Sequence, residues 1–533
     1  MAVQDDIVIG IDLGTTYSCA AVVREGRPHV IPSEQGYLTV PSVVALDKTG
    51  GIIVGQPALD QIVINPTQTI FGSKRLIGRK FNSILVQKML GAMTYPIVEG
   101  PNSEAAVILG GKMRSMTEIS SHILGEVKEM AQGRLGTEIH RAIITVPAYY
   151  NDNQRQAVVE AGKRAGFTVE GIVNEPTAAA IAYGYNKGLE QKILVYDLGG
   201  GTLDISILKV RANSFTVLAT GGNTFLGGVD FDTRITEHMV EKFNQATGKD
   251  LTGEKVAMQR VRSAAEHAKR ELSTEKIASI ELPYITEVDR APVDLKMKLT
   301  REQLVNLTSD LVERTIETCG EVLASIPMKT KDLDEILLVG GQTRMPLVQS
   351  RIAEFFGKPP RKGVHPDEVV ALGAAILADS VAKHADVRLS DVLAIPIGVA
   401  LPSGKFKAIL RRNTPLPASK TYKLTADEKS IEIDIYQGES KNVLENEYLG
   451  TFCFPSPPRQ KRGSRKLEMR FDLSPQCLLR VQATDLGTGE KTYAQMVTQQ
   501  TPKSLVAGME AAMASRTRKP HWLVLFAQRI LGK

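Results

Sequence analysis

The segment at residues 8–23, VIGIDLGTTYSCAAVV, joins two apolar runs through an aspartate, a glycine and two threonines. The apolar runs predict two strands, and the small polar residues between them predict a tight turn. A second segment of the same plan, KILVYDLGGGTLDISILKV, occupies residues 192–210. In both places a short turn and a third strand-like run follow. The sequence therefore predicts the same three-stranded meander at two places in the chain.

Two further pairs of segments repeat at a similar spacing. One pair predicts a strand, a turn and a helix that ends at glycine, and the other predicts a helix of small residues that lets two backbones pack closely. The pairs are 141–166 with 335–357, and 174–184 with 367–378. Matching blocks that are about 185 to 194 residues apart indicate two homologous lobes, 1–187 and 188–383, that face each other across a cleft.

The two turns predict a site for a nucleotide polyphosphate. Small residues let backbone N–H groups and threonine hydroxyls approach phosphate oxygens, and aspartates supply hard oxygen ligands for Mg²⁺ and its waters. The threonines are Thr15, Thr16 and Thr202, and the aspartates are Asp12, Asp197 and Asp204. Either turn alone is better explained as a simple hairpin, and it is the presence of two related copies that favours the nucleotide site. A P-loop is excluded, because no Gly-Lys pair is followed by Ser or Thr.

Length and composition set broad limits. A chain of 533 residues predicts two to four domains at ~150 residues each. The net charge of +6 does not by itself indicate nucleic acid or membrane, and no partner of either kind is expected from it. The four cysteines, Cys19, Cys319, Cys453 and Cys477, are far apart and predict packing thiols rather than zinc or disulfides. An acidic start and the lack of a long apolar run lead us to expect a cytoplasmic protein.

Seven segments resemble the nucleotide-binding domain of the seventy-kilodalton heat-shock chaperones, of the bacterial DnaK type, within the actin and hexokinase superfamily. They are GIDLGTTYS, KRLIGRKF, VPAYYND, NEPTAAAIAYG, DLGGGTLD, LGGVDFD and LLVGGQTRMP. The resemblance covers residues 7 to about 380 and continues less closely to about 498. It implies an α/β two-lobed actin-like ATPase domain with duplicated βββαβα lobes, then an all-β sandwich domain, with the long helical lid absent.

The resemblance also implies a slow ATPase of chaperone type that uses ATP/ADP, Mg²⁺ and K⁺. Lys74 would contact the γ-phosphate and the attacking water, and Glu175 would lie near that water. Asp12 and Asp197 would hold Mg²⁺ through water, and Asp204 would order the water and K⁺. The implied catalytic residues are Lys74, Glu175, Asp12, Asp197, Asp204 and Thr202.

Further residues would bind the nucleotide. Those of the phosphate loops are Gly14, Thr15, Thr16, Tyr17, Gly199, Gly200, Gly201 and Gly227. Those around the adenosine are Glu266, Lys269, Arg270, Ser273, Gly340, Gly341, Arg344 and Asp367. The first four of this second set recur at helical spacing and share one helix face. Without the resemblance, a solvated surface explains that charged stripe equally well.

A linker at 384–395 is expected to connect the ATPase domain to the next domain. Pro147 and Arg155 match the family's allosteric relay to the distant domain, although a strand end and a helix N-terminal charge also explain them. In the family, the apolar run at 392–395 pairs with the edge of the ATPase domain when ATP is bound. Here Pro396 stands where the family has an acidic residue, and proline cannot donate to a strand ladder, so we expect altered docking.

Residues 396–502 alternate apolar and polar residues in short runs, as in a β-sandwich. The resemblance implies a domain that binds extended apolar peptides, with Ala426, Ile431 and Ile433 lining the cleft. The segment before Asn413 is about five residues shorter than in the family. The family forms its first strands and an arch over the peptide there, so the sequence does not establish that arch.

The C-terminal tail, 503–533, is short, basic and apolar. Because it is too short for the family's lid, we expect fast peptide exchange. A helix packed on the sandwich explains the tail better than membrane contact, which stays the alternative. The basic run at 459–466 is expected to be a solvated loop.

Gly171 stands where the DnaK type has an arginine that engages J-domain proteins, so we expect weak stimulation of the ATPase by a J-domain protein. The resemblance also implies a nucleotide-exchange factor as a partner. Three function classes follow from the sequence. The leading one is an ATP-dependent chaperone in protein folding and the stress response. The second is a regulatory ATPase or scaffold with one dedicated partner. A small-molecule kinase of the same superfamily ranks last, because such an enzyme needs neither the linker nor the β-domain.

Overall fold

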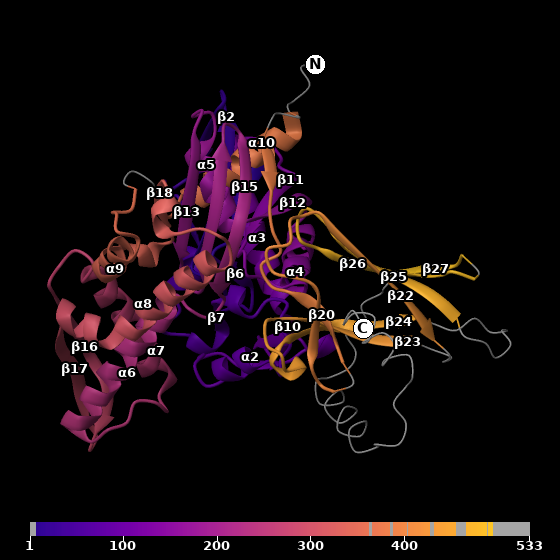
Figure 1. The fold of residues 1–533 in the computed structure, drawn as a ribbon. Coiled ribbons are helices and arrows are strands. Elements are labelled where there is room, and N and C mark those ends of the chain that lie inside the picture. Colours follow the sequence, from indigo (N-terminus) through magenta and orange to yellow (C-terminus); the bar gives the residue numbers. More distant parts are fainter. Residues whose placement is uncertain are drawn as a thin grey trace.

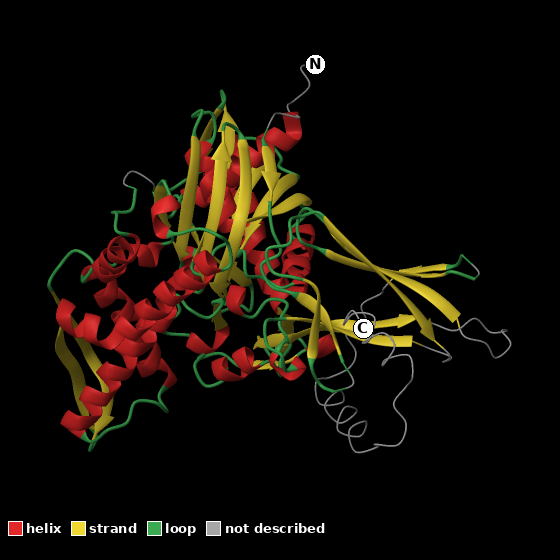
Figure 2. Cartoon of the chain, in the orientation of Figure 1, coloured by secondary structure: helices red, strands yellow, loops and turns green. Residues whose placement is uncertain are grey.

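The structure is a computed structural model that describes residues 7–361, 365–383, 387–401, 403–426, 431–454, 465–487 and 489–493. Two α/β lobes lie next to each other, and a β-domain extends from one side of them (Figures 1 and 2). Within these described ranges, no helix has the length and apolar character needed to cross a membrane.

Lobe I is built on a six-stranded sheet. Its strands lie in the order β12 (Thr168–Asn174), β11 (Arg141–Val146), β1 (Val8–Asp12), β2 (Tyr17–Arg24) and β3 (Arg27–Val30), and β4 (Val40–Pro41) pairs with β2. β1 runs parallel to β11 and antiparallel to β2. Most residues of β1 and β11 are buried, as expected for strands whose two faces are both covered.

The remaining elements of lobe I surround this sheet. The helices are α1 (Gln56–Asp60), α2 (Ile84–Met89), α3 (Met116–Leu135), α4 (Asp152–Arg164) and α5 (Glu175–Gly184), with 3-10 turns η1 (Pro66–Gln68), η2 (Ser73–Arg75) and η3 (Pro101–Ser103). Two small sheets contain β5 (Val43–Leu46), β6 (Ile52–Val54) and β7 (Thr69–Phe71), and β8 (Ile97–Glu99), β9 (Ala105–Leu109) and β10 (Lys112–Ser115). A capping box between Asn151 and Gln154 fixes the start of α4.

Lobe II has a five-stranded sheet. The order is β18 (Glu335–Val339), β13 (Glu190–Leu198), β14 (Leu203–Arg211), β15 (Ser214–Asn223) and β19 (Arg388–Ser390). The helices are α6 (Gly228–Thr247), α7 (Lys255–Glu271), α8 (Arg301–Ala324), α9 (Pro346–Phe356) and α10 (Val369–Lys383), with η4 (Thr330–Asp332), η5 (Gly341–Arg344) and the hairpin of β16 (Ile277–Val288) and β17 (Ala291–Thr300). Strands β18, β13, β14 and β15 repeat the order of β11, β1, β2 and β3, as the duplicated segments predict.

The two helices of small residues, α5 and α10, pack against each other between the lobes. A Cβ atom built on Gly373 would lie 1.7 Å from the carbonyl oxygen of Ala178. A Cβ atom built on Gly10 would lie 2.1 Å from the backbone nitrogen of Ala375. Only glycine allows these approaches, and the close backbone packing predicted from the sequence is confirmed.

The β-domain contains two four-stranded antiparallel sheets. One has the order β21 (Phe406–Leu410), β20 (Ile397–Ala400), β23 (Ile431–Gln437) and β24 (Glu447–Phe454), and the other β22 (Ala418–Ala426), β25 (Arg465–Leu473), β26 (Leu479–Asp485) and β27 (Lys491–Tyr493). The turn η6 (Val443–Glu445) precedes β24. Both sheets contribute to one core, which includes Val399, Phe452 and Phe471. The first two strands do form in the shortened segment before Asn413.

The linker adds a strand to lobe II, but not where the sequence led us to expect it. Arg388–Ser390 pairs in parallel with β15, so β19 precedes the apolar run at 392–395. The Asp391 carboxylate accepts hydrogen bonds from Asn174 at 2.9 Å and Thr177 at 3.1 Å. Beyond it, Val392 packs in the core between the lobes and Leu393 packs in the β-domain core. Side chains of lobe I thus hold the chain directly after the strand.

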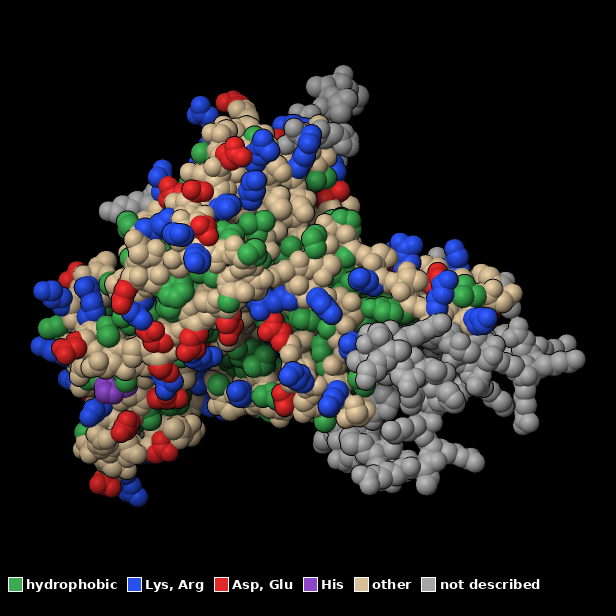
Figure 3. Space-filling model, in the orientation of Figure 1, with side chains coloured by type: hydrophobic (Ala, Val, Ile, Leu, Met, Phe, Trp, Pro, Cys, Tyr) green, Lys and Arg blue, Asp and Glu red, His purple; other side chains and the backbone are tan. Residues whose placement is uncertain are grey.

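Three of the cysteines fit their predicted packing role. Cys19, Cys319 and Cys477 are buried free thiols, and burial raises the pKa of each. The Cys453 side chain, most of the basic run at 459–466 and the whole tail at 503–533 lie outside the described residues. On the face shown in Figure 3, positive and negative side chains are interspersed over both lobes.

Candidate active site

The glycine and threonine turns of the two lobes meet. A Cβ atom built on Gly200 would lie 2.2 Å from Thr16 Oγ1, and one on Gly201 would lie 2.7 Å from Thr15. A Cβ atom on Gly227 would lie 2.6 Å from the Gly201 nitrogen. The residues predicted for the phosphate loops lie on or beside this contact: Gly14, Thr15, Thr16, Tyr17, Gly199, Gly200, Gly201, Thr202 and Gly227. The absence of side chains at these glycines is therefore what allows the turns of the two lobes to approach each other this closely.

Three aspartates lie at the ends of the paired strands. Thr145 donates a hydrogen bond of 2.9 Å to Asp12 Oδ1, and the Tyr149 backbone N–H donates one of 3.0 Å to Asp204 Oδ1. A Cβ atom on Gly340 would lie 2.7 Å from Asp197 Oδ1. Asp12 and Asp197 lie at the ends of β1 and β13, and Asp204 lies at the start of β14, directly after the second glycine turn. The fold thus gathers them as the sequence predicts.

Lys74 and Glu175 form a buried ion pair beside these carboxylates. Lys74 lies in η2 and Glu175 begins α5, and each residue is 5% exposed. The Tyr150 hydroxyl donates a hydrogen bond to the Lys74 carbonyl and fixes the backbone at this point. The two residues whose roles came only from the resemblance therefore contact each other directly.

The electrostatics of the cluster favour an added cation. Burial, reinforced by Glu175, raises the pKa of Asp12 to about 7, and burial raises the pKa of Asp204 to about 6. Burial together with nearby carboxylates raises the pKa of Asp197, and burial raises the pKa of Glu175. Burial alone would lower the pKa of Lys74, but Glu175 and Asp12 outweigh it and raise it. One lysine cannot neutralise four carboxylates, so a positive ion stabilises their charged forms.

The donor set fits an ion that keeps its waters. Asp204 Oδ2 is buried and has no hydrogen-bond partner among the described residues. Within the same residues, no group of three or more His, Cys, Asp or Glu side chains is arranged to hold a metal ion directly. Mg²⁺ usually keeps several waters and takes only one or two carboxylates, which suits Asp12, Asp197 and Asp204 acting through water.

Lys269, one of the predicted adenosine residues, contacts Gly228. Lys269 Nζ donates 3.0 Å to the Gly228 carbonyl, and it pairs with Asp232 at 2.9 Å. A Cβ atom on Gly228 would also lie 3.1 Å from Gln342 Oε1, which the sequence reading did not single out. Lys269 is 8% exposed, so this part of the α7 stripe is not a solvated surface.

The other predicted adenosine residues lie on or beside helix α7 and turn η5. Glu266 and Ser273 are half-buried, and Arg270 is exposed on α7. Arg344 pairs with Asp367 at 2.6 Å, and a Cβ atom on Gly341 would lie 3.4 Å from Asp367 Oδ1. Helix α7 and turn η5 therefore present the two sides that the sequence places around a nucleoside.

Arg155 connects the segment after Pro147 to the linker. Its guanidinium donates 2.9 Å hydrogen bonds to the Ala148 carbonyl and to Asn174 Oδ1. Asn174 in turn donates 2.9 Å to Asp391. The residues named for an allosteric relay thus lie on a continuous set of contacts between the lobe I strand end and the linker.

The β-domain contacts lobe I directly. The Asp152 backbone N–H donates a hydrogen bond of 3.0 Å to Gln437 Oε1. Asp152 Oδ1 accepts a hydrogen bond of 2.7 Å from the Leu479 backbone N–H. Burial raises the pKa of Asp152 to about 6. A cavity of about 1270 Å³ lies beside this contact, lined by α4 and by residues 472–480, and it contains none of the predicted nucleotide residues.

Gly171 lies on β12 at this same domain contact. A Cβ atom built on it would lie 2.8 Å from Gln476 Nε2, so a β-domain side chain occupies the space above the glycine. In the predicted peptide cleft, Ile433 is 5% exposed and packs in the β-domain core. Ala426 ends β22 and Ile431 begins β23, but their side chains are outside the described residues. The cleft stays a prediction.

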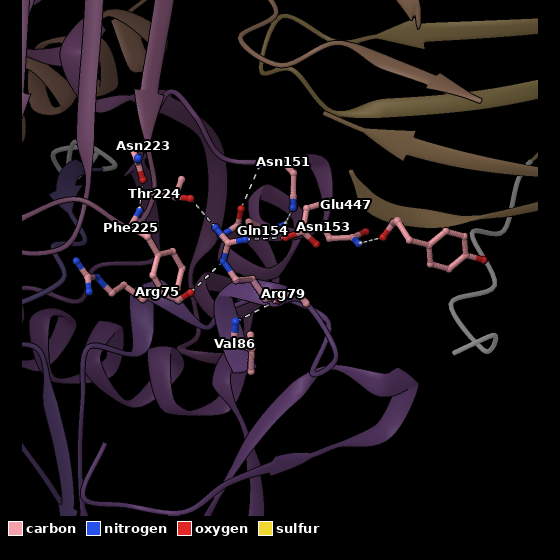
Figure 4. Close-up of polar contacts among 12 residues, drawn as sticks. Arg75, Arg79, Val86, Asn151, Asn153, Gln154, Asn223, Thr224, Phe225 and Glu447 are labelled. Atoms are coloured by element: carbon pink, nitrogen blue, oxygen red, sulfur yellow. Dashed lines mark hydrogen bonds and ion pairs between the residues drawn. The ribbon is translucent and has the colours of Figure 1, made fainter. Parts of the chain in front are cut away.

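Sequence reasoning missed several residues that contact the site. Arg75 donates 3.1 Å to the Gly201 carbonyl and pairs with Asp230 of lobe II. Arg79 reaches both lobe II and the β-domain (Figure 4). The available signal was the basic run at 74–80, in which all four cations are buried: Lys74, Arg75, Arg79 and Lys80.

A comparison with protein families agrees with this geometry. The family model described as Hsp70 protein matches residues 8–521. The match includes both lobes, the linker and the described part of the β-domain. The chain therefore belongs to the Hsp70 family.

Proposed function

We propose that this protein is an ATP-dependent chaperone that couples slow ATP hydrolysis in its lobes to the binding of extended apolar peptides in its β-domain. Hsp70 proteins are, as a family, ATPases and chaperones that bind ATP or ADP with Mg²⁺. The observation that carries the proposal is the contact between the two glycine turns beside the buried Lys74–Glu175 pair.

ATP binding would use groups from both lobes. Backbone N–H groups of the glycine turns and the hydroxyls of Thr15, Thr16 and Thr202 suit phosphate oxygens. The adenosine would lie between α7 and η5, near Gly228. Because both lobes supply groups that would bind the phosphates, bound nucleotide would favour the arrangement in which the lobes are together.

Hydrolysis would depend on fixed charges. Lys74 would stabilise the negative charge that builds on the transferred phosphoryl group. Glu175 would orient the attacking water, and Asp204 Oδ2, which is buried without a partner in the described chain, would accept a hydrogen bond from it. Mg²⁺, held through water by Asp12 and Asp197, would neutralise phosphate charge, and K⁺ near Asp204 would add to this.

The β-domain would bind the peptide as a sandwich of its two sheets. An extended peptide gains main-chain hydrogen bonds, while pockets select its side chains. The contacts of Asp152 with Gln437 and Leu479, and of Asn174 with Asp391, give the domain a physical connection to lobe I.

Partners and location follow from the same proposal. A nucleotide-exchange factor would act on the lobes, and Gly171 would weaken stimulation by a J-domain protein because glycine offers no charge. We place the protein in the cytoplasm, as its cysteine usage suggests.

Steady-state ATP hydrolysis by the full chain, with and without a panel of extended apolar peptides, tests this function. We expect slow hydrolysis that many peptides stimulate and that the Lys74→Ala variant loses. Hydrolysis that no peptide changes would favour a protein with one dedicated partner. Turnover equal to that of Lys74→Ala would refute the ATPase.

A further inference from the structure

Arg79 contacts three parts of the molecule at once (Figure 4). Its Nε donates 3.0 Å to the Arg75 carbonyl of lobe I. One terminal nitrogen donates a hydrogen bond of 2.7 Å to Thr224 Oγ1 of lobe II, and the other forms an ion pair of 2.9 Å with Glu447 of the β-domain. Arg79 itself is 3% exposed. A single buried guanidinium therefore joins both lobes and the β-domain.

The contacts continue from Arg79 to the phosphate loop. The Phe225 ring lies against both guanidinium groups, and its centroid is 5.2 Å from Arg75 Cζ and 5.2 Å from Arg79 Cζ. Arg75 donates 3.1 Å to the Gly201 carbonyl, which belongs to the predicted phosphate loop. An unbroken set of contacts thus runs from Gly201 to Glu447.

The buried charge of Arg79 makes these contacts depend on Glu447 of the β-domain. A buried guanidinium is stable only when its N–H groups are paired, and the pairing of Arg79 is complete only when the β-domain supplies Glu447. These contacts share no residue with the Arg155, Asn174 and Asp391 set. They therefore form a separate connection between the domains.

We infer that Arg79 is a positioning residue through which the β-domain contact at Glu447 favours the observed arrangement of the lobes and holds Arg75 on the phosphate loop. The inference rests on the proposed function, since it supposes that the loops bind ATP. Linkage requires the effect to be reciprocal: if the Glu447 contact tightens ATP binding, ATP strengthens the Glu447 contact by the same factor.

The first test compares two neutralised glutamates in the full chain. Glu447→Gln keeps the side-chain shape but removes the charge that pairs with Arg79. Glu445→Gln is the matched control, because the Glu445 carboxylate bonds, among the residues that the structure describes, only to Ser440 and Asn442 of its own loop. We expect the affinity for MgATP, measured by calorimetry, to fall about fivefold or more in Glu447→Gln and to stay unchanged in Glu445→Gln. Equal affinity in Glu447→Gln and wild type would overturn the inference.

A double-mutant cycle separates a connection from two independent contacts. Thr224→Val removes the hydrogen bond to lobe II at similar volume. If Arg79 connects the parts, the double variant Thr224→Val with Glu447→Gln loses no more ATP affinity than the single variant that has the larger loss. Fold losses that multiply would overturn the inference. A wild-type chain that binds no ATP would refute the proposed function, whereas normal binding with an unaffected Glu447→Gln would refute only the role of Arg79.

Discussion

Thr145 donates a hydrogen bond of 2.9 Å from its hydroxyl to Oδ1 of Asp12, across the neighbouring strands β11 and β1. The hydrogen bond lowers the pKa of Asp12, against the larger effect of burial, which raises it. Thr145 is fully buried and has no other predicted role. It therefore acts on the site by favouring the ionised form of Asp12 and by orienting its carboxylate.

The substitution Thr145→Val tests this relationship. Loss of a hydrogen bond to a charged group costs about 1.5–3 kcal/mol, so the pKa of Asp12 rises by about one unit or more. We expect the acid limb of the kcat/KM profile for ATP hydrolysis to move to higher pH by that amount. Thr145→Ser keeps the hydroxyl and is expected to behave as wild type. Identical pH profiles for Thr145→Val and wild type would contradict this role.

Lys74→Ala is expected to bind ATP and to hydrolyse it about 10²-fold or more slowly, because it removes charge stabilisation that matters most in the transition state. Single-turnover hydrolysis together with ATP binding by calorimetry separates the two effects. Lys80→Ala is the matched control, since Lys80 is also buried but bonds to the Asn102 carbonyl. Unchanged turnover in Lys74→Ala would remove Lys74 from the catalytic site.

The stability of the nucleotide-free chain should depend on Asp204 in a predictable direction. The folded pKa of Asp204 is about 6, above the unfolded value of about 4, so the folded state binds more protons between these values. The contribution of this carboxyl to stability is therefore lost as pH rises from about 4 to about 6. We expect Asp204→Asn to melt a few degrees above wild type at pH 8 and at about the same temperature at pH 4. A difference that does not change with pH would contradict the raised pKa.

Gly171→Arg is expected to increase J-domain stimulation of the ATPase. The new guanidinium supplies a charge worth on the order of 2 kcal/mol or more to a paired partner. The structure adds that Gln476 must move, which is feasible because only the end of its flexible side chain lies within 2.8 Å. Gly171→Leu controls for size without charge. If Gly171→Leu gives the same gain, or Gly171→Arg gives none, the charge explanation is wrong.

Much of the fold was accessible from the sequence because its signals are local. Strand and turn patterns in the segments from Val8 and from Lys192 predicted two sheets of the same order. The small residues around Ala178 and Gly373 predicted helices in close contact, since only small side chains permit it. The gathering of Asp12, Asp197 and Asp204 was predictable because aspartates at strand ends meet where two related turns face each other.

Other features depend on partners that are distant in sequence. The linker strand is at Arg388–Ser390 because Asn174 and Thr177 hold Asp391, which no local pattern reveals. The role of Arg79 likewise depends on Glu447, which is 368 residues away. From the sequence alone, a basic run is interpreted as solvated surface, because its buried partners are identified only in the folded chain.

The coupling of ATP to the β-domain is tested most directly by the release rate of a fluorescent extended apolar peptide from the full chain. The peptide is bound in the presence of ADP and then chased with unlabelled peptide in either MgATP or MgADP. We expect release to be about fivefold or more faster in MgATP, because the nucleotide changes the arrangement of the lobes that the β-domain contacts. Equal release rates in the two nucleotides, from a chain that hydrolyses ATP, would contradict it.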